Sequence, residues 1–297
     1  MLQPVIRHYH IHDVSEYINW IYFFHAWGFQ PRFASIADIH GCDACRAMWL
    51  ARFPENERAK AAEAMQLHKE AMRMLVELDT HYQTHGLFRL MEANSEDNDI
   101  WMEGYRFPFL RQQSSKSGEP YLCLSDFIRP LSNGISDRIG LFATSVDSSM
   151  ENLHEDDNYK HLLVKTLADR LAEATSEKLH EQVRKDLWGY APEEHFTIRQ
   201  LHQEEFHGIR PAVGYPSLPD MSVNFILDEL LDMKQIGIHL TENGMMRPHA
   251  SVSGLMFAHP SSRYFSIGKI DEDQLEDYAR RRGLPTDTMR KFLAANL

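Results

Sequence analysis

The 297-residue chain contains few cysteines and no long apolar run. Three cysteines are too few, and odd in number, for a disulfide scaffold, so we expect a reducing compartment and place the protein in the cytoplasm. No apolar stretch approaches the roughly 20 residues that cross a bilayer, which argues against a membrane span. We therefore expect a cytoplasmic protein with no membrane partner.

Positive charge is also scarce. The chain has 31 Lys and Arg against 43 Asp and Glu, and its net charge of −12 disfavours nucleic acid and anionic membranes as partners. The local exception is Arg280-Arg281-Arg282, with Arg290 and Lys291 nearby. We expect these residues on the solvent face of C-terminal helices, and a docking patch for an acidic protein is the alternative. Phosphate-binding GxGxxG and P-loop motifs and the GxSxG elbow of hydrolases are missing.

The apolar content of 43% is ordinary for a globular protein, and the length allows one large domain or two small ones. Apolar periodicity predicts helices at 55–85 (ended by Gly86), 158–188, 222–236, 272–282 and 286–295. Asp13 and Glu16 resemble a capping box before another helix. Strands are expected at 4–11, 99–109, 137–146, 250–258 and 263–270. Because strands and helices do not alternate as βαβ units, the class is α+β with antiparallel strands, helical over about 13–86 and mixed beyond.

Cys42 and Cys45 form a CxxC pair, which can indicate zinc or redox chemistry. A zinc site needs two more ligands. His40 is close, but no second pair follows at a ribbon-like spacing, so structural cysteines near a helix start are the favoured interpretation and no metal site is expected. His8, His10 and His12 would share one face of a strand, where an incidental metal site is the less favoured alternative.

The segment 208–216, GIRPAVGYP, has two prolines and two glycines and is predicted to be a shaped, extended loop. It would hold Arg210 and Tyr215 in fixed places. A guanidinium held in this way suits a carboxylate or a phosphate, because its planar fork makes two parallel hydrogen bonds. From composition alone, a simple connector with a solvated Arg210 is the favoured interpretation.

This segment resembles the GIRPAxGYP signature of the activation domain of cobalamin-dependent methionine synthase, the module that binds S-adenosylmethionine (AdoMet). The resemblance runs in order from about residue 15 to the C-terminus. The matching stretches include YINW (17–20), LSDFI (124–128), KTLADRL (165–171), WGYAP (188–192), PHASVSG (248–254), YFSIGKI (264–270) and DQLEDYA (273–279). It implies an unusual C-shaped single domain over 1–297, with a twisted antiparallel sheet and flanking long helices.

The resemblance also implies a site. Arg210 would take the AdoMet carboxylate, and Glu173 and Glu204 match acidic positions of the family's site. Tyr264 and Phe265 match its aromatic pair. The backbone of Ala212, Gly214 and Tyr215 would form much of the groove, and Tyr215 would also face the cobalamin. For the acids the alternative is a solvated helix face, and for the aromatics a core strand.

One position departs from the family pattern. Asn19 stands where the family has an aspartate that contacts AdoMet. An asparagine keeps an acceptor oxygen but loses a negative charge, which predicts an affinity lower by about tenfold or more.

The resemblance implies one component of a split methionine synthase. The chain would bind AdoMet and dock on a separate cobalamin-bearing subunit for the reductive methylation of cob(II)alamin, with no catalytic side chain and no turnover alone. A flavodoxin-like protein is one candidate electron donor. The alternatives are a docking module that no longer uses AdoMet and a reactivator of another corrinoid methyltransferase.

Overall fold

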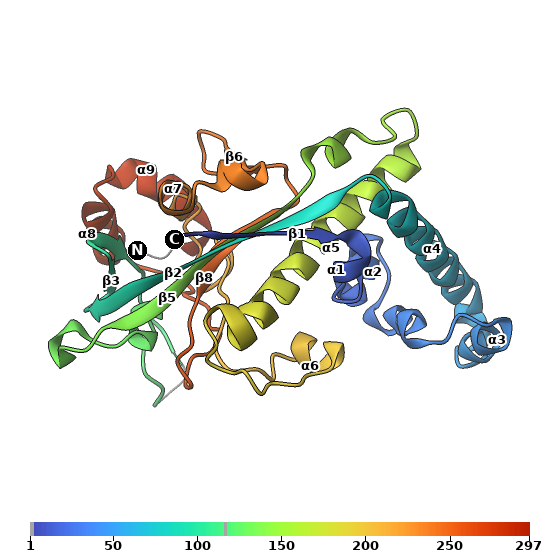
Figure 1. Cartoon of the computed structure of the whole chain (residues 1–297), viewed down its shortest axis with the longest axis horizontal. Helices are drawn as coiled ribbons and strands as arrows, with labels where there is room; N and C mark the ends of the chain where they lie inside the picture. The colour runs from blue at the N-terminus through green and yellow to red at the C-terminus, as the bar shows by residue number, and fades with distance from the viewer. Residues whose placement is uncertain (1–2, 116–117) are drawn as a thin grey trace.

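A twisted antiparallel sheet runs across the molecule in the computed structural model, which describes residues 3–115 and 118–297 (Figure 1). Its strands are β1 (Val5–His10), β2 (Gln83–Glu96), β3 (Asp99–Met102), β4 (Tyr105–Pro108), β5 (Asp137–Val146) and β8 (Ser251–Met256). The order is β4-β3-β2-β5-β8, and β1 pairs with the part of β2 that β3 leaves free. The short strands β6 (His239–Leu240) and β7 (Met246–Arg247) pair separately. The sheet is antiparallel throughout, as expected.

The central strands carry apolar side chains at successive positions. Because successive side chains of a strand point to opposite faces, the sheet is buried on both faces. Phe88 and Phe142 point into one core, together with the long helices. Leu87, Leu141 and their neighbours point into a second core on the opposite face. The run of buried residues from Ile139 to Val146 in β5 follows from this double burial.

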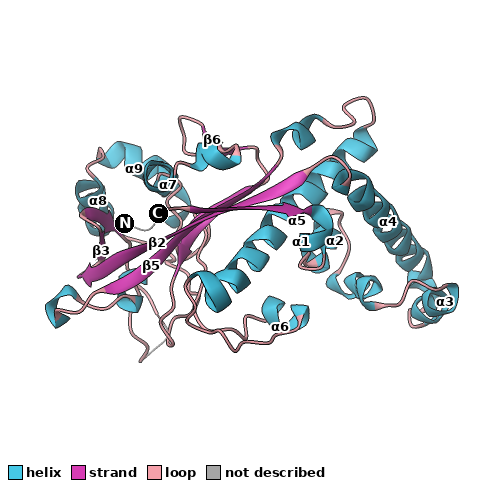
Figure 2. Ribbon diagram, viewed as in Figure 1, coloured by secondary structure: helices cyan, strands magenta, loops and turns pink. Residues whose placement is uncertain are grey.

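Helix α5 packs along the first face, and the other helices of the N-terminal half gather around α5 and beyond the end of the sheet (Figure 2). These helices are α1 (Ile11–Ser15), α2 (Trp20–Ala26), α3 (Asp43–Ala51), α4 (Glu55–Asp79) and α5 (Asn158–Gln182). Small hydroxyl side chains let α5 approach the sheet closely. Thr144 and Ser176 hydroxyls lie 2.7 Å apart, and Thr175 donates to Thr84 at 2.8 Å. These buried contacts fix the helix that supplies the acids of the site described below.

The second face is covered by α7 (Val223–Leu231), and the chain ends in α8 (Glu272–Arg282) and α9 (Thr286–Phe292). The short helix α6 (Ile198–His202) follows α5. None of the described helices is long and apolar enough to cross a membrane.

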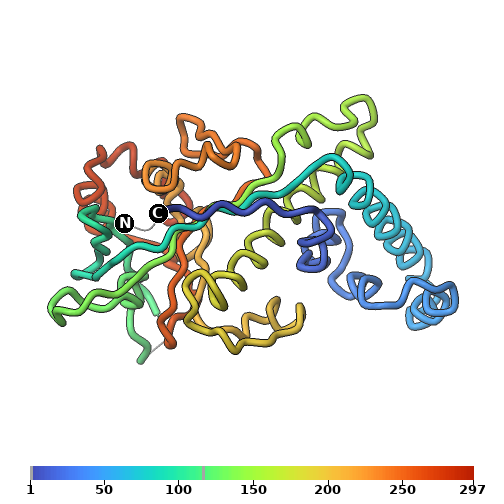
Figure 3. Tube along the Cα trace, viewed as in Figure 1, coloured from blue at the N-terminus to red at the C-terminus, as the bar shows by residue number. Residues whose placement is uncertain are grey.

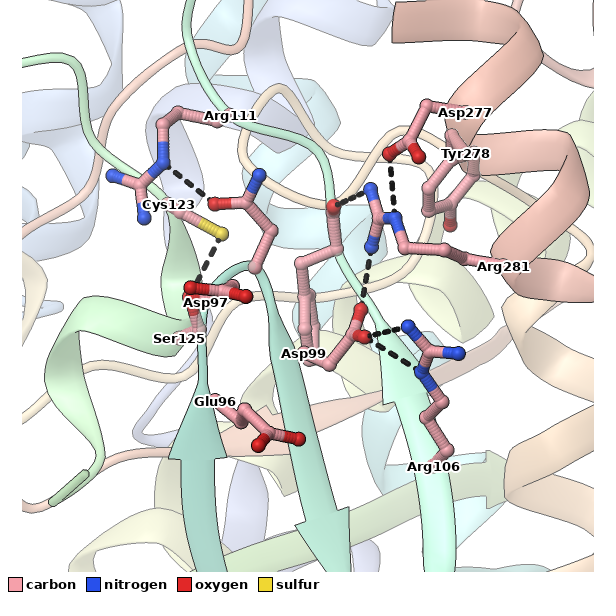
Figure 4. A network of polar contacts seen from close by, with 12 residues as sticks. Glu96, Asp97, Asp99, Arg106, Arg111, Cys123, Ser125, Asp277, Tyr278 and Arg281 are labelled. Carbon is pink, nitrogen blue, oxygen red and sulfur yellow. Dashed lines mark hydrogen bonds and ion pairs between the residues drawn. The ribbon is translucent and has the colours of Figure 1, made fainter. Parts of the chain in front are cut away.

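Ion pairs attach α8 to the β3–β4 hairpin, and they correct the expectation for the arginine run. Only Arg280 is largely exposed; the side chains of Arg281 and Arg282 are 7% and 5% exposed. Arg281 donates to Asp99 at 2.5 Å, and Asp99 also accepts from Arg106 at 2.6 Å (Figure 4). Because buried carboxylates need partners, two of the three arginines turn inward, and this run is not a solvent-facing patch.

The first long helix was predicted too long. It ends at Asp79, and Gly86 lies within β2, paired with Arg7 and Thr144. A Cβ at Gly86 would lie 3.3 Å from a methyl group of Leu179 on α5, so this glycine serves close helix–sheet packing and does not end the helix.

Three other local predictions were also wrong. Asp13 does not cap a helix, because α1 begins at Ile11 directly after β1. Residues 99–109 form two strands, with a turn at Glu103 and Gly104 where φ is positive. Residues 263–270 form no strand and make isolated backbone bonds, such as Ile267 N–H to Pro216 at 2.9 Å.

The helix boundaries near the site also differ from expectation. The helix expected over 158–188 ends at Gln182 and continues as a π-helical turn, Val183–Leu187. The helix expected over 222–236 is α7 followed by a 3₁₀ turn, with Asp232 at positive φ between them.

Candidate functional site

A pocket of about 610 Å³ lies beside α5, where several distant parts of the chain meet. Its walls come from the segment before and at the start of α2, from the middle of α5, from residues 201–204 and from the loop 208–217 with residues 264–266. The lining residues are Tyr17, Asn19, Tyr22, Arg170, Glu173, Ala174, Glu177, Leu201, His202, Glu204, Arg210, Pro211, Ala212, Tyr215, Pro216, Ser217, Val252, Tyr264, Phe265 and Ser266. All the predicted site residues except Gly214 are in this set.

The loop at 208–216 is irregular and extended, as predicted, and it is held against β8. Ile209 and Phe257 exchange backbone hydrogen bonds of 3.0 and 2.9 Å, and Val213 N–H donates to Ser253 at 2.9 Å. The approach is so close that a Cβ on Gly254 would overlap the carbonyl of Pro211. Glycine at this position therefore lets the loop extend the sheet edge and places its side chains in the pocket wall.

Arg210 is the only basic residue of this loop, and its side chain is 9% exposed. Its guanidinium pairs with Glu177 of α5, and its backbone N–H donates to the Tyr264 hydroxyl at 2.9 Å. Burial alone would lower the pKa of Arg210, but the charges of Glu177, Tyr264 and Glu173, together with the Glu177 hydrogen bond, outweigh burial and raise the pKa. A fixed, permanently charged guanidinium thus stands in the pocket wall.

Glu173 lies one helical turn before Glu177 on α5, so both carboxylates face the pocket. Glu173 accepts from the Tyr215 hydroxyl at 2.6 Å. Desolvation and this carboxylate raise the pKa of Tyr215, so its hydroxyl stays protonated and can donate. Tyr215 is nevertheless 51% exposed and lies at the mouth of the pocket.

Glu204 is held in an uncommon backbone conformation, with φ of 57°. A non-glycine residue in the left-handed region costs energy, and such residues concentrate at functional sites. Burial, and then the charge of Glu177, raise the pKa of Glu204, with Arg210 acting against them. The structure thus gathers three carboxylates around one buried arginine.

Asn19 caps α2. Its side-chain oxygen accepts from Ile21 N–H at 3.1 Å, so the acceptor that sequence reasoning assigned to a ligand already has a partner. Gly214 does not line the pocket. It lies at φ of 87° and its N–H donates to Leu218 at 2.8 Å, which shapes the turn that places Tyr215.

The pocket lining includes three carboxylates and two guanidinium groups, those of Arg170 and Arg210. It therefore carries an excess of one negative charge. Tyr17, Tyr22, Tyr264 and Phe265 add aromatic surface. The arrangement suits a small amphipathic ligand that carries a carboxylate and at least one positive charge, with a flat group for the aromatic side.

Comparison with known proteins identifies the fold. Residues 10–283 match the family model of the vitamin B12 dependent methionine synthase activation domain. The chain belongs to this family. The crystal structure of the MetH reactivation domain bound to AdoHcy is similar, with a TM-score of 0.88 and 36% sequence identity over 100% of this chain and 90% of that one. The match confirms the expected fold class, a C-shaped α+β single domain with a twisted antiparallel sheet and long helices.

Sequence reasoning missed several pocket residues, of which Glu177 is the most important. The sequence does contain an indication that Glu177 has a charged partner. Glu173 and Glu177 are like charges at i and i+4, a pairing that destabilises a helix unless a cation compensates it. Here that cation is Arg210. Tyr17, Tyr22 and His202 carry no comparable signal, because only the folding of their segments against α5 brings them to the pocket, where Arg170 of α5 also lies.

The histidine prediction was partly wrong. His8 and His10 are on β1, but His12 is the second residue of α1 and pairs with Asp79 at 2.8 Å. His8 contacts His85 at 2.8 Å instead. The three histidines therefore do not share one strand face.

Proposed function

We propose that the pocket binds AdoMet and that the chain presents its methyl group to cobalamin. The observation that carries the proposal is one buried arginine surrounded by carboxylates in a pocket of about 610 Å³, within the range of small-molecule sites. The similar MetH reactivation domain was crystallised with AdoHcy, which supports the same ligand class.

The residues fit the groups of AdoMet. Arg210 has five N–H donors and Glu177 accepts from its Nη2 atom, so donors remain for the α-carboxylate of the ligand. Glu173 and Glu204 offer acceptors to the α-ammonium and the sulfonium. Tyr264 and Phe265 offer aromatic surface to the adenine.

The charge of the lining supports AdoMet over its product. AdoMet carries one more positive charge than AdoHcy, on the sulfonium. An excess of one negative charge in a partly desolvated pocket attracts that sulfonium. We therefore expect tighter binding of AdoMet than of AdoHcy, with the preference reduced by salt.

The side chains of this chain bind and orient, and none is needed as a nucleophile or general base. Bound AdoMet supplies an electrophilic methyl group to reduced cobalamin. Arg210 fixes the carboxylate end of the ligand, and Glu173, which accepts from the exposed Tyr215, would place the sulfonium and its methyl group near the mouth of the pocket. Tyr215 is thus our proposed cobalamin-facing residue, and the contribution of the chain is proximity and orientation.

We further propose that the cobalamin is carried by a partner chain, a cobalamin-binding methionine synthase subunit, with a flavodoxin-like protein as a candidate electron donor. The support is that the matching family model belongs to a vitamin B12 dependent enzyme, and that Tyr215 of the pocket is exposed and accessible to a docked protein. Methyl transfer to cobalamin on the partner chain then requires only that the Tyr215 side of the pocket contact the corrin ring.

The test is methyl transfer from radiolabelled AdoMet to cobalamin on the purified partner under one-electron reduction. The expected result is label on cobalamin that requires this chain and falls at least tenfold in a Glu173→Gln, Glu204→Gln double variant. Arg138→Ala, an exposed residue near the start of β5, is the control and should behave as wild type. AdoMet binding without transfer to this partner, but with transfer to another corrinoid protein, would replace the methionine synthase assignment. No AdoMet binding would favour a docking module.

A further inference from the structure

A second cluster of chemically reactive side chains lies far from the pocket. His40, Cys42 and Cys45 lie just before and in the first turn of α3, a helix at the opposite side of the molecule from α8 and α9 (Figures 1 and 3). One ligand atom of each residue lies within 4.8 Å of the others. His40 and Cys42 are exposed and Cys45 is half-buried.

Local folding brings these three residues together. Cys42 is the N-cap of α3, and its Sγ accepts from Cys45 N–H at 3.2 Å. The two sulfur atoms are then on the same side of the first turn, 2.8 Å apart. A tight turn, in which Cys42 N–H donates to the His40 carbonyl at 2.9 Å, folds the imidazole back toward the thiols. In the sequence His40 is only a close neighbour of the cysteine pair; in the structure this turn brings its imidazole within 4.8 Å of both thiols.

We propose that His40, Cys42 and Cys45 form a site for a divalent zinc-type cation, with the fourth coordination position open to solvent. Two thiolates and an imidazole are the ligands that zinc prefers, and the two thiolate charges neutralise the cation. Tetrahedral zinc with bonds of about 2.3 Å requires the sulfur atoms about 3.8 Å apart. The thiols must separate by about 1 Å, which rotation of exposed side chains can provide.

The neighbouring groups leave this site accessible. Asp43 pairs with Arg46 at 3.2 Å and points into solvent, so its carboxylate does not occupy the cluster. The third cysteine, Cys123, is buried, accepts from Ser125 at 3.1 Å and belongs to a different part of the fold (Figure 4). Among the described residues there is one other candidate group, His10, His12 and Asp79. It has no thiolate, and Asp79 already accepts from both the His12 ring and its backbone N–H.

A metal at this position would join the turn before α3 to the first turn of that helix. Because binding to the folded state stabilises it, the thermal midpoint should rise with zinc concentration. The AdoMet pocket should be unaffected, since none of its lining residues belongs to this segment. The proposal therefore stands or falls independently of the proposed function.

The test is titration of the full chain, reduced and freed of metal with a chelator, with Co²⁺ followed by Zn²⁺. We expect one equivalent of Co²⁺ with a near-ultraviolet thiolate charge-transfer band that Zn²⁺ abolishes. Cys42→Ser and Cys45→Ser should each weaken binding at least 100-fold, and His40→Ala by about 10- to 100-fold. His25→Ala, another exposed histidine, is the matched control and should leave the affinity unchanged.

Three results would overturn the proposal. One is no uptake by the reduced protein. Another is uptake that survives Cys42→Ser but is lost in His12→Ala, which would move the site to the second cluster. The third is a Cys42–Cys45 disulfide that forms in the presence of excess zinc, as measured by the loss of free thiols. The three ligands lie at the surface, so unfolding midpoints of the metal-free variants should match wild type and exclude misfolding as the cause.

Discussion

Asn19 is the pocket residue whose substitution tests the predicted AdoMet contact most sharply. Its oxygen caps α2 by accepting from Ile21 N–H, so one lone pair of that oxygen and the side-chain NH₂ remain for a ligand. An NH₂ donor facing a cationic ligand is unfavourable. In Asn19→Asp one carboxylate oxygen can keep the cap while the other accepts from the ligand.

The expected gain follows from these contacts. A hydrogen bond to a charged group contributes about 1.5–3 kcal/mol, which corresponds to about 10- to 100-fold in affinity. Asn and Asp are equivalent at the N-cap, and the helix dipole favours the carboxylate by about 0.3–1 kcal/mol. Asn19→Asp should therefore bind AdoMet at least tenfold more tightly, with unfolding free energy equal to or slightly above that of wild type.

Isothermal titration calorimetry with AdoMet, run beside denaturant unfolding, measures both quantities. Asn19→Ala is the control, because it removes the cap, costs about 0.5–2 kcal/mol of stability and should not strengthen binding. Equal or weaker AdoMet affinity in a stable Asn19→Asp protein would refute the placement of this residue against a positive group of the ligand.

Three further predictions concern the structure around the pocket. Gly254→Ala should push the loop away from β8 by overlap with Pro211, lowering stability by about 1–3 kcal/mol and weakening AdoMet binding, as read by unfolding and calorimetry. Glu204→Gln should raise the thermal midpoint at pH 7.5, because the raised pKa of Glu204 means that the folded state disfavours its ionised carboxylate. The difference in midpoint from wild type should disappear as the pH falls to about 4.5, where the carboxyl is protonated. Arg184→Ala should cost about 3–5 kcal/mol in denaturant unfolding, because it leaves Glu194, 4% exposed, without its buried partner.

The sequence predicted the parts of the fold that depend on local pattern. Apolar periodicity located the long helices, and the strand at 137–146 matches β5. It missed β2, the strand at the centre of the sheet. The polar residues Arg89 and Asn94 break the apolar pattern of β2, and both make tertiary hydrogen bonds to backbone carbonyls. Such partners are set by the fold and leave no periodic signal.

In the candidate site, too, some features follow from the local sequence and others depend on contacts between distant segments. The shape of the loop at 208–216 follows from its prolines and glycines, whereas its contacts do not. Arg210 was expected to take the ligand carboxylate, and the structure adds an ion pair with Glu177 that the sequence did not indicate, because a buried guanidinium needs a counter-charge. The residues 263–270 were expected to be a strand, yet Tyr264 instead supports the Arg210 backbone. Each difference comes from contacts between distant segments.

The central claim is that AdoMet binds in this pocket with its carboxylate on Arg210. Calorimetric titration of AdoMet into wild type and Arg210→Ala tests it most directly. Arg210→Ala leaves the Glu177 carboxylate without its counter-charge. The double variant Arg210→Gln, Glu177→Gln should therefore be measured as well, with unfolding curves for wild type and both variants. The account predicts saturable one-to-one binding to wild type and at least a 100-fold loss in both folded variants. Absence of binding to wild type at millimolar AdoMet, or binding unchanged without the guanidinium, would contradict it.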